Sequence, residues 1–420
     1  MNSESFLIAN IGQLITFSSK GLPGGPRKAR ALGQIGLMTG GDVAILIREG
    51  RIVEVGPWRK VRSRAGRRAV ELNAHGKAVL PGFVDSHTHA LFLRPRLADF
   101  EARIAGAGYE EIAKKGGGIL KTVSYVRGAS REELRDSLEV WCRRALALGT
   151  TTMEVKSGYG LDLPSEQKML EVIGSARTPL EIIPTFLGAH ALAPEYRAEP
   201  ERYVEEIIKV MLPRLRRLAR FCDVFCDRGY FSLVETRKIL TAAKKLGYGL
   251  KIHAEQLSCT GASGLGARLG AASVDHLDHA GSADLERLAR SSTVATLLPG
   301  CSFFSGRGVW PPARDMIGRG VAVALATDFN PGSSPSLAMG FVLSLAVTQM
   351  KMTAQEALGA ATINGAYAVG RGDDLGAIEP GRQADIIVTE ASDWREIPYY
   401  FAMDMVRAVI KKGALVTSKN

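Results

Sequence analysis

Between about residue 82 and residue 372, apolar runs of strand length alternate with segments of helical periodicity. The strand-like runs include TTTMEV at 150–155, LEIIPTFLG at 180–188 and FCDVFC at 221–226, and a candidate helix follows each of them. Strands joined through helices pair in parallel, because the return path between them needs the length of a helix. This repeated alternation predicts an α/β fold, with a (β/α)8 barrel of the TIM type over residues 81–372.

The two chain ends lack helical periodicity and contain strand-like runs separated by glycine turns. DVAILIREGRIVEVG at 42–56 is typical of a hairpin, and MVRAVIKKGALV at 405–416 has the same character. We therefore predict that residues 1–80 and residues 373–420 together form a small β-sandwich module beside the barrel. The segment 18–36 (SSKGLPGGPRKARALGQIG) is rich in glycine, proline and basic residues, which predicts a mobile surface loop.

The composition, with 46% hydrophobic and 23% charged residues in 420, is that of a soluble globular protein. The net charge of +11 suggests a nucleic-acid partner, but the densest basic stretches, at 58–70 and 214–220, carry no nucleic-acid motif and are typical of solvated helix faces. We therefore expect no nucleic-acid partner. No apolar run is long enough for a membrane span and the first residues lack a signal-peptide pattern, so we expect no membrane association and a cytoplasmic protein.

The five cysteines are odd in number and scattered along the chain, which is typical of proteins in a reducing compartment. Cys222 and Cys226 are four residues apart, but a metal knuckle would need a second such pair, which the sequence lacks. Both are therefore predicted to be small core residues.

Histidines follow several predicted strands at the point where each strand ends. His87 and His89 lie one residue apart in AVLPGFVDSHTHA at 78–90. Alternate residues of a strand project to the same side, so these two imidazoles can converge on one point. His253 in LKIHAEQ and Asp328 in VALATDFNPG end later strands, and the carboxyl ends of barrel strands meet at one mouth. Three imidazoles and a carboxylate predict a site for one divalent metal ion, with room for a water.

A set of motifs covers nearly the whole chain: PGFVDSHTH, YEEIAKKGGGI, TTMEVKSGYG, PTFLGAHA, KIHAEQ, SVDHL and VALATDFNPGSSP. In these motifs the chain resembles the metal-dependent amidohydrolase superfamily and, within it, the imidazolonepropionase family. The resemblance implies a mononuclear Zn²⁺ or Fe²⁺/Fe³⁺ site held by His87, His89, His253 and Asp328. It implies that an activated water opens the ring amide of 4-imidazolone-5-propanoate, a small anionic heterocycle, to give N-formimidoyl-L-glutamate in L-histidine degradation. It also implies a homodimer.

The resemblance assigns substrate contacts to six further positions: Arg96, Tyr159, His190, Asn330, Gly332 and Ser333. The guanidinium of Arg96 is suited to a forked pair with the propanoate carboxylate. Arg94 lies two residues away, but the spacing from the first histidine favours Arg96. A phenol at 159 and an imidazole at 190 can donate hydrogen bonds to the ring or carboxylate oxygens.

The proton-transfer groups are less clearly marked. Related deaminases carry a glutamate three residues after the strand-end histidine, where this chain has Gln256. An amide cannot take a proton from water, so Gln256 is predicted to orient the substrate, and the base role passes to His276 or Asp328. The neighbouring Glu255 is expected to point away from the site if the strand persists.

Three alternatives remain open. Lys156 could be carbamylated and bridge two metal ions, although a lysine at a strand end is commonly paired with a carboxylate such as Glu154 or Asp328. The enzyme could act on another cyclic amide or amidine, as a cyclic amidase or a deaminase. Some proteins of the superfamily have lost their metal and serve as scaffolds, but this chain has a histidine or an aspartate at all four ligand positions.

Overall fold

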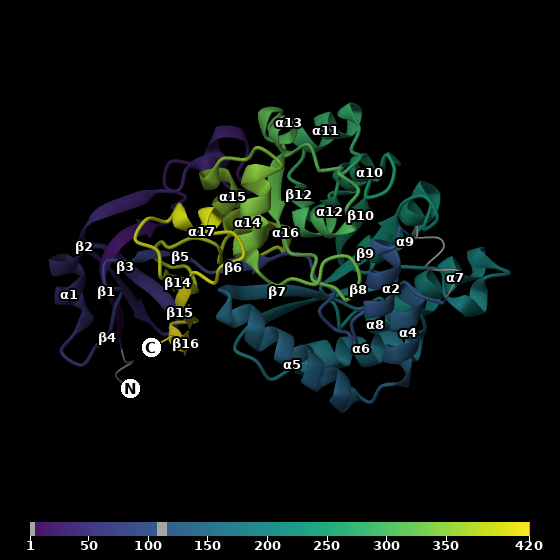
Figure 1. Ribbon diagram of the computed structural model, residues 1–420, viewed down its shortest axis with the longest axis horizontal. Coiled ribbons are helices and arrows are strands. Elements are labelled where there is room, and N and C mark those ends of the chain that lie inside the picture. The colour runs from purple at the N-terminus through teal and green to yellow at the C-terminus, as the bar shows by residue number, and fades with distance from the viewer. Residues whose placement is uncertain (1–4, 107–115, 420) are drawn as a thin grey trace.

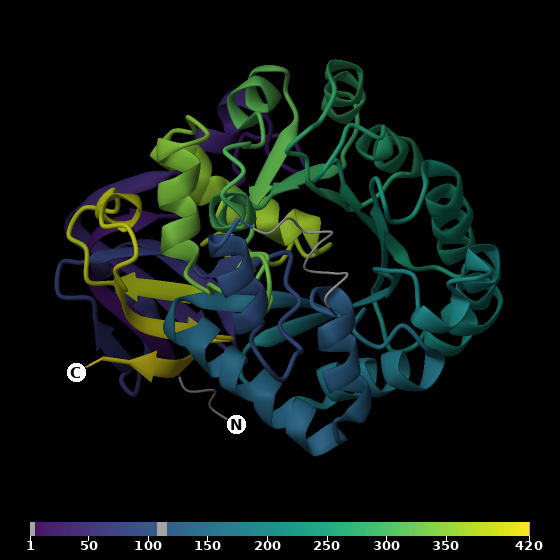
Figure 2. The ribbon, with the colours of Figure 1, turned by 45° about the vertical axis from the view of Figure 1, so that its right-hand side comes forward.

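The computed structural model describes residues 5–106 and 116–419, so most of the YEEIAKKGGGI motif lies outside the described residues. Eight parallel strands follow one another around a barrel in sequence order (Figures 1 and 2). They are β6 (Phe83–Asp85), β7 (Thr150–Lys156), β8 (Glu181–Ala189), β9 (Phe221–Cys226), β10 (Gly249–Ala254), β11 (Ser273–His276), β12 (Val294–Leu297) and β13 (Ala322–Leu325). The predicted (β/α)8 barrel is confirmed.

The barrel closes through two short segments, residues 87–89 just after β6 and residues 328–329 just after β13. The amide of Asp328 donates to the carbonyl of His87 at 3.0 Å, and the amide of His89 donates to the carbonyl of Phe329 at 2.9 Å. Thr88 and Phe329 form a parallel bridge between these bonds. The segment that carries the two histidines is therefore part of the ring.

Helices cover the outside of the barrel (Figure 2). After β6 to β9 come α2 (Leu97–Ile104), α4 (Ile119–Gly128), α5 (Arg131–Ala147), α6 (Leu163–Ser175), η2 (Pro194–Tyr196), α7 (Pro200–Glu206), η3 (Ile207–Met211), α8 (Leu212–Leu215) and α9 (Leu233–Lys245). After β10 to β13 come α10 (Ala262–Leu269), α11 (Ser282–Ala289), α12 (Pro299–Ser305), α13 (Ala313–Gly318), α14 (Met339–Thr348), α15 (Ala354–Ala361) and α16 (Ile363–Ala368). Capping boxes start some of them; in α9 the Ser232 hydroxyl accepts from the Glu235 amide while Glu235 reaches back to the Ser232 amide. Among the described helices, none is both long and apolar enough to cross a bilayer.

Strands from both chain ends join one further sheet, which contains the predicted hairpin. Its members are β1 (Phe6–Ile15), β2 (Leu37–Arg48), β3 (Arg51–Pro57), β4 (Val70–Asn73), β5 (Ala78–Pro81), β14 (Ile386–Thr389), β15 (Val406–Lys411) and β16 (Ala414–Ser418). Helix α1 (Trp58–Ala65) packs on this sheet, whereas η1 (Ala29–Gly33) packs against α15 and α17 (Glu396–Tyr399) against α14. The join between the ends is β14, which pairs antiparallel with β5. This sheet has its own apolar core, in which Ile8 and Ile45 from one end meet Ile386 and Ile410 from the other. The predicted limits at residues 80 and 372 stay a prediction.

The prediction of a mobile surface loop at 18–36 is wrong for its second half. Arg27 and Leu32 are buried, and the amide and carbonyl of Arg27 both bond to the side chain of Asn364. Lys28 reaches the carbonyls of Ala289 and Ser291 on the barrel. The segment is therefore held between the small sheet and the barrel by its backbone and by two basic side chains.

Two smaller predictions are confirmed. In the basic stretch at 58–70, α1 buries Val61 and Ala65 and leaves its basic residues at the surface. Cys222 and Cys226 are buried in β9, and all five cysteines are free thiols.

A buried ion pair beside the barrel allows a test of how the small sheet is attached. Lys411 is only 3% exposed, and its ammonium lies 2.6 Å from Asp385 and 3.4 Å from Glu181. Lys411→Met would leave a buried carboxylate without its cation, so we expect the free energy of unfolding in urea to fall by about 3 kcal/mol. Lys412→Met is the matched control, because that side chain is 60% exposed. Equal urea midpoints for the two variants would contradict this account.

Candidate active site

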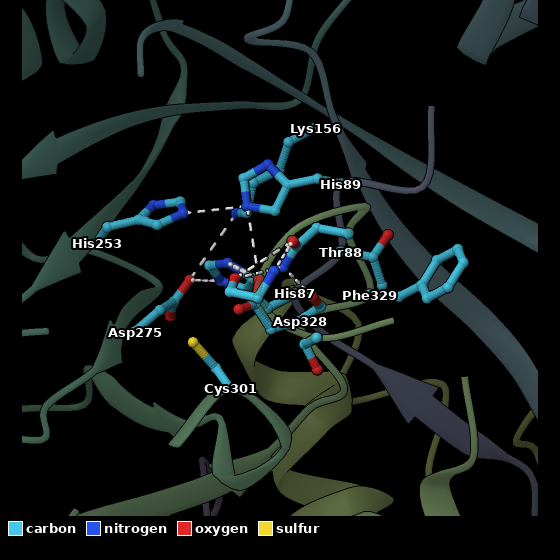
Figure 3. A network of polar contacts seen from close by, with 12 residues as sticks. His87, Thr88, His89, Lys156, His253, Asp275, Cys301, Asp328 and Phe329 are labelled. Atoms are coloured by element: carbon cyan, nitrogen blue, oxygen red, sulfur yellow. Dashed lines mark hydrogen bonds and ion pairs between the residues drawn. The ribbon is translucent and has the colours of Figure 1, made fainter. Parts of the chain in front are cut away.

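The four predicted metal ligands converge at the carboxyl end of the barrel, and all are buried. The Nε2 atoms of His253 and His89 lie 3.2 Å apart, and Asp328 Oδ1 lies 3.6 Å from His87 Nε2 and 3.7 Å from His89 Nε2 (Figure 3). Four ligands arranged tetrahedrally around one ion, each about 2.1 Å from it, would lie about 3.4 Å from one another. The donor atoms therefore have the spacing that a single first-row divalent ion requires.

The protonation of these groups also fits a cation. Burial holds the pKa values of His87 and His89 well below the usual range, and the charge of Lys156 adds to the effect at His87, so both rings are neutral. His87 Nε2 has no hydrogen-bond partner in the described part of the chain. Burial raises the pKa of the Asp328 carboxyl to about 8. Unpaired buried lone pairs and a desolvated carboxyl are the features that a bound cation would stabilise.

Carboxylates below the histidines, which the sequence analysis missed, orient two of the rings. Asp275 Oδ2 lies 2.6 Å from His87 Nδ1, and Asp223 Oδ2 lies 3.0 Å from His253 Nδ1. Burial alone would raise the pKa of Asp223, but His253 and Lys156 outweigh it and hold that pKa below its usual value. A charged residue inside a strand that is otherwise buried was the signal that could have identified both aspartates.

Lys156 lies in this lower layer and not among the ligand atoms. Its ammonium is 2.7 Å from Asp223 and 2.8 Å from Glu154. Of the two carboxylates expected as partners, Lys156 therefore pairs with Glu154 and not with Asp328. Burial opposes its charge, yet Asp223 and Glu154 raise the pKa of Lys156 above its ordinary value. Carbamylation requires a neutral amine, so this pairing disfavours the bridging role.

Three predicted substrate residues line one side of the cluster. The ring of His190 stacks on His89 at 4.9 Å, and Tyr159 lies 5.3 Å from His190. Arg96 is half-buried, donates from Nε to Thr122 at 2.8 Å, and lies 5.9 Å from the centre of the Tyr159 ring. These contacts place an aromatic wall and a guanidinium beside the ligand atoms.

His190 differs from the expectation that it would donate to the substrate. Burial, and then the charge of His253, lower the pKa of His190 to about 3, so its ring is neutral near pH 7. Its Nδ1 lies 2.9 Å from the carbonyl of Gly158, which can only accept, so Nδ1 carries the ring's single proton. Nε2 is then left as an acceptor.

The loop after Asp328 is organised by Asn330. Its side-chain oxygen accepts from the amides of Gly332 and Ser333 at 2.8 and 2.7 Å, and its nitrogen donates to the carbonyl of Asp328 at 2.6 Å. A Cβ atom at Gly332 would lie 2.5 Å from a guanidinium nitrogen of Arg96. Asn330 therefore shapes the turn, and Gly332 leaves room for the arginine.

Three further residues considered in the sequence analysis are His276, Gln256 and Glu255. His276 has a ligand atom within 4.8 Å of those of His87 and Asp328, so it belongs to the same cluster. Gln256 is half-buried and donates to Cys301 Sγ at 3.4 Å. Glu255 turns away, as expected, and accepts from the amide of Ser263 at 3.0 Å, near the start of α10.

Comparison with known proteins places the chain in a family. The profile of the amidohydrolase family matches residues 78–416. An imidazolonepropionase of Symbiobacterium thermophilum is 44% identical over 431 positions, covering 100% of this chain and 99% of the relative, and one of Solibacter usitatus is 45% identical and covers 99% of both. The chain belongs to the amidohydrolase family. Within it, the chain belongs with the imidazolonepropionases, as the motifs predict.

Among solved amidohydrolase-like structures, an adenosine deaminase from Xanthomonas campestris with bound zinc aligns with a TM-score of 0.71. The alignment covers 98% of this chain and 92% of the deaminase at 18% identity. At this identity the likeness shows a shared fold.

In this amidohydrolase a buried carboxylate organises the loop that carries Tyr159. Glu166 on α6 accepts from the amides of Gly158, Gly160 and Leu161 at 2.8 to 3.1 Å. Glu166→Gln would turn an NH₂ group toward some of these donors, so we expect these amides to exchange with deuterium at least roughly tenfold faster, since a lost charge-assisted bond is worth about 1.5–3 kcal/mol. The same exchange measurement on Glu171→Gln, on the outer side of α6, should show no change. Unchanged protection in Glu166→Gln would show that the carboxylate does not hold the loop.

Proposed function

We propose that the chain hydrolyses the ring amide of 4-imidazolone-5-propanoate to N-formimidoyl-L-glutamate, a step of L-histidine degradation. The observation that carries the proposal is the similarity to imidazolonepropionases over the whole length of both chains. The converging histidines and Asp328 support it, because amide hydrolysis at neutral pH needs an activated water. The enzyme is also proposed to be a homodimer, as the family resemblance implies, and to act in the cytoplasm, a reducing compartment that suits its five free cysteines.

One divalent ion per chain would be held by His87, His89, His253 and Asp328, whose donor atoms have the spacing described above. Imidazole and carboxylate ligands suit both Zn²⁺ and Fe²⁺. Such an ion lowers the pKa of a water and polarises a carbonyl.

The substrate carries an anionic tail and a ring N–H group, and the site offers a partner for each. Arg96 would form a forked pair with the propanoate carboxylate. Its guanidinium is oriented by the hydrogen bond to Thr122 and lies in the space that Gly332 leaves. His190 Nε2 would accept from a ring N–H, because Nδ1 already donates to Gly158. Tyr159, whose ring lies near both of these side chains, would cover the ring of the substrate.

Hydrolysis breaks the bond between the ring carbonyl carbon and its nitrogen, and that nitrogen must gain a proton. His276 is neutral, because burial and then His253 hold its pKa well below the usual range. A neutral imidazole can take the proton that the water loses and return it to the leaving nitrogen. Gln256 can do neither and would orient the substrate through hydrogen bonds.

The proposal is tested with freshly generated imidazolone propanoate, by following its ultraviolet absorbance. We expect the metal-loaded protein to consume the substrate, a chelator to stop the reaction, and Zn²⁺ or Fe²⁺ to restore it. Asp328→Ala should abolish turnover, because it removes one of the four ligand side chains. Failure of the metal-loaded wild-type protein to consume the substrate would rule the function out.

Arg96 and Arg94 provide a second test. Arg96→Gln should raise KM and lower kcat/KM by roughly 10- to 100-fold, as expected for the loss of a charge-assisted pair worth about 1.5–3 kcal/mol. Arg94→Gln is the control, because that guanidinium is exposed and lies over the ring of Tyr125, 5.2 Å from its centre. An equal change of kcat/KM in both variants would show that the propanoate carboxylate of the substrate does not bind at Arg96.

A further inference from the structure

A layer of charged side chains without solvent exposure lies beneath the histidine cluster. It consists of Glu154 and Lys156 on β7, Asp223 on β9, Lys251 on β10 and Asp275 on β11. Lys156 Nζ lies at the centre of this layer, 2.7 Å from Asp223, 2.8 Å from Glu154 and 3.9 Å from Asp275 (Figure 3). No step of the proposed reaction uses this ammonium.

Two of the carboxylates determine which nitrogen of a histidine carries the proton. Asp275 faces His87 Nδ1 at 2.6 Å, and Asp223 faces His253 Nδ1 at 3.0 Å. A carboxylate oxygen only accepts hydrogen bonds, so a proton on Nδ1 is the one that suits this contact, and Nε2 is then the nitrogen whose lone pair is available to a metal ion. The Nε2 atoms are those that face the centre of the cluster, so this tautomer is the one that can bind a metal ion.

The position of Asp223 depends on two contacts only. Its Oδ2 atom lies near both Lys156 and His253, whereas its Oδ1 atom has no hydrogen-bond partner in the described structure. Without the ammonium, Asp223 would lose its one charge-assisted hydrogen bond, and only the contact with His253 would remain at this carboxylate. His253 would then lose the fixed acceptor that orients its ring.

We infer that Lys156 is a positioning residue, which anchors Asp223 against His253 Nδ1 and thereby directs the His253 lone pair at the metal position. The inference rests on the metal site of the proposed function. The ammonium of Lys156 pairs with the carboxylates of the lower layer. Its effect on the metal position would therefore pass through those carboxylates.

Lys251 is an equally buried lysine that makes different contacts. Its ammonium donates to the carbonyl of Ser86 at 2.9 Å and lies 3.4 Å from Glu154 and 3.8 Å from Asp275. The structure shows no ion pair between Lys251 and Asp223. Lys251→Met therefore removes a buried charge from the same layer and leaves the anchor of Asp223 in place.

The experiment compares Lys156→Met with Lys251→Met in the metal-free full-length protein. Histidine tautomers are read from long-range ¹H–¹⁵N NMR spectra, and Zn²⁺ affinity from competition with a chromogenic chelator. For Lys156→Met we expect His253 to lose its single Nδ1–H form and Zn²⁺ affinity to fall roughly 10- to 100-fold, the usual range for loss of a group that orients a ligand. For Lys251→Met we expect the His253 signals of the wild type.

Wild-type His253 signals and Zn²⁺ affinity in Lys156→Met would overturn the inference, as would an equal change of His253 in Lys251→Met. If Lys156→Met does not fold, the double variant Lys156→Met with Asp223→Asn removes one charge of each sign, and the same loss of affinity is expected. Wild-type affinity in the double variant would also overturn it. Turnover of imidazolone propanoate by the unaltered enzyme tests the proposed function and is independent of these results.

Discussion

The barrel of this chain closes through the same short segments that carry His87, His89 and Asp328, three of the four proposed metal ligands. The amide of Asp328 donates to the carbonyl of His87, and the amide of His89 donates to Phe329. Asp85, the last residue of β6, accepts from both the amide and the hydroxyl of Thr327. Because these bonds complete the ring, the backbone of His87, His89 and Asp328 is held in place by the closure of the barrel. The fold thus supplies the rigidity that a preorganised site requires, and the loops need only supply the contacts to the substrate.

The layer of buried charge is the second constraint on the site. Burying charged groups is unfavourable unless they are paired and hydrogen-bonded, so a core built for stability alone would have apolar residues there. The layer contains three carboxyl groups and two ammoniums, and two further buried carboxyl groups, those of Asp85 and Asp328, lie close to it. A divalent cation would offset this excess of acidic groups. We interpret these charged groups as the support of a cation site, in which carboxylates orient the imidazoles and lysines orient the carboxylates.

The sequence indicated the candidate ligands more clearly than the side chains that surround them. His87, His253 and Asp328 could be found because each follows an apolar strand, and parallel strands end at one edge. Asp275 belongs to the SVDHL motif. Its strand is buried on both faces, however, and in such a strand the sequence pattern does not indicate which side chain a charged residue pairs with. The burial of Arg27 was missed for a related reason, because glycine, proline and basic residues indicate a loop but not which surface the loop packs against. Pairings between distant segments are what local sequence patterns omit.

Backbone conformation at the strand ends explains how one residue serves both closure and chemistry. Non-glycine residues with left-handed backbone lie at or just after the ends of β10, β11 and β13: Glu255 (φ 51°), His276 (φ 82°), Leu277 (φ 64°) and Asp328 (φ 53°). Each such conformation costs about 1–2 kcal/mol for a residue with a side chain. At Asp328 the sharp turn lets the amide bond to the His87 carbonyl while the carboxylate lies 3.6 Å from Nε2 of the same histidine. A right-handed or extended residue there would change the direction of the side chain relative to the amide and separate those two roles. The strain is therefore retained where it places the carboxylate among the ligand atoms, and the surrounding barrel offsets it.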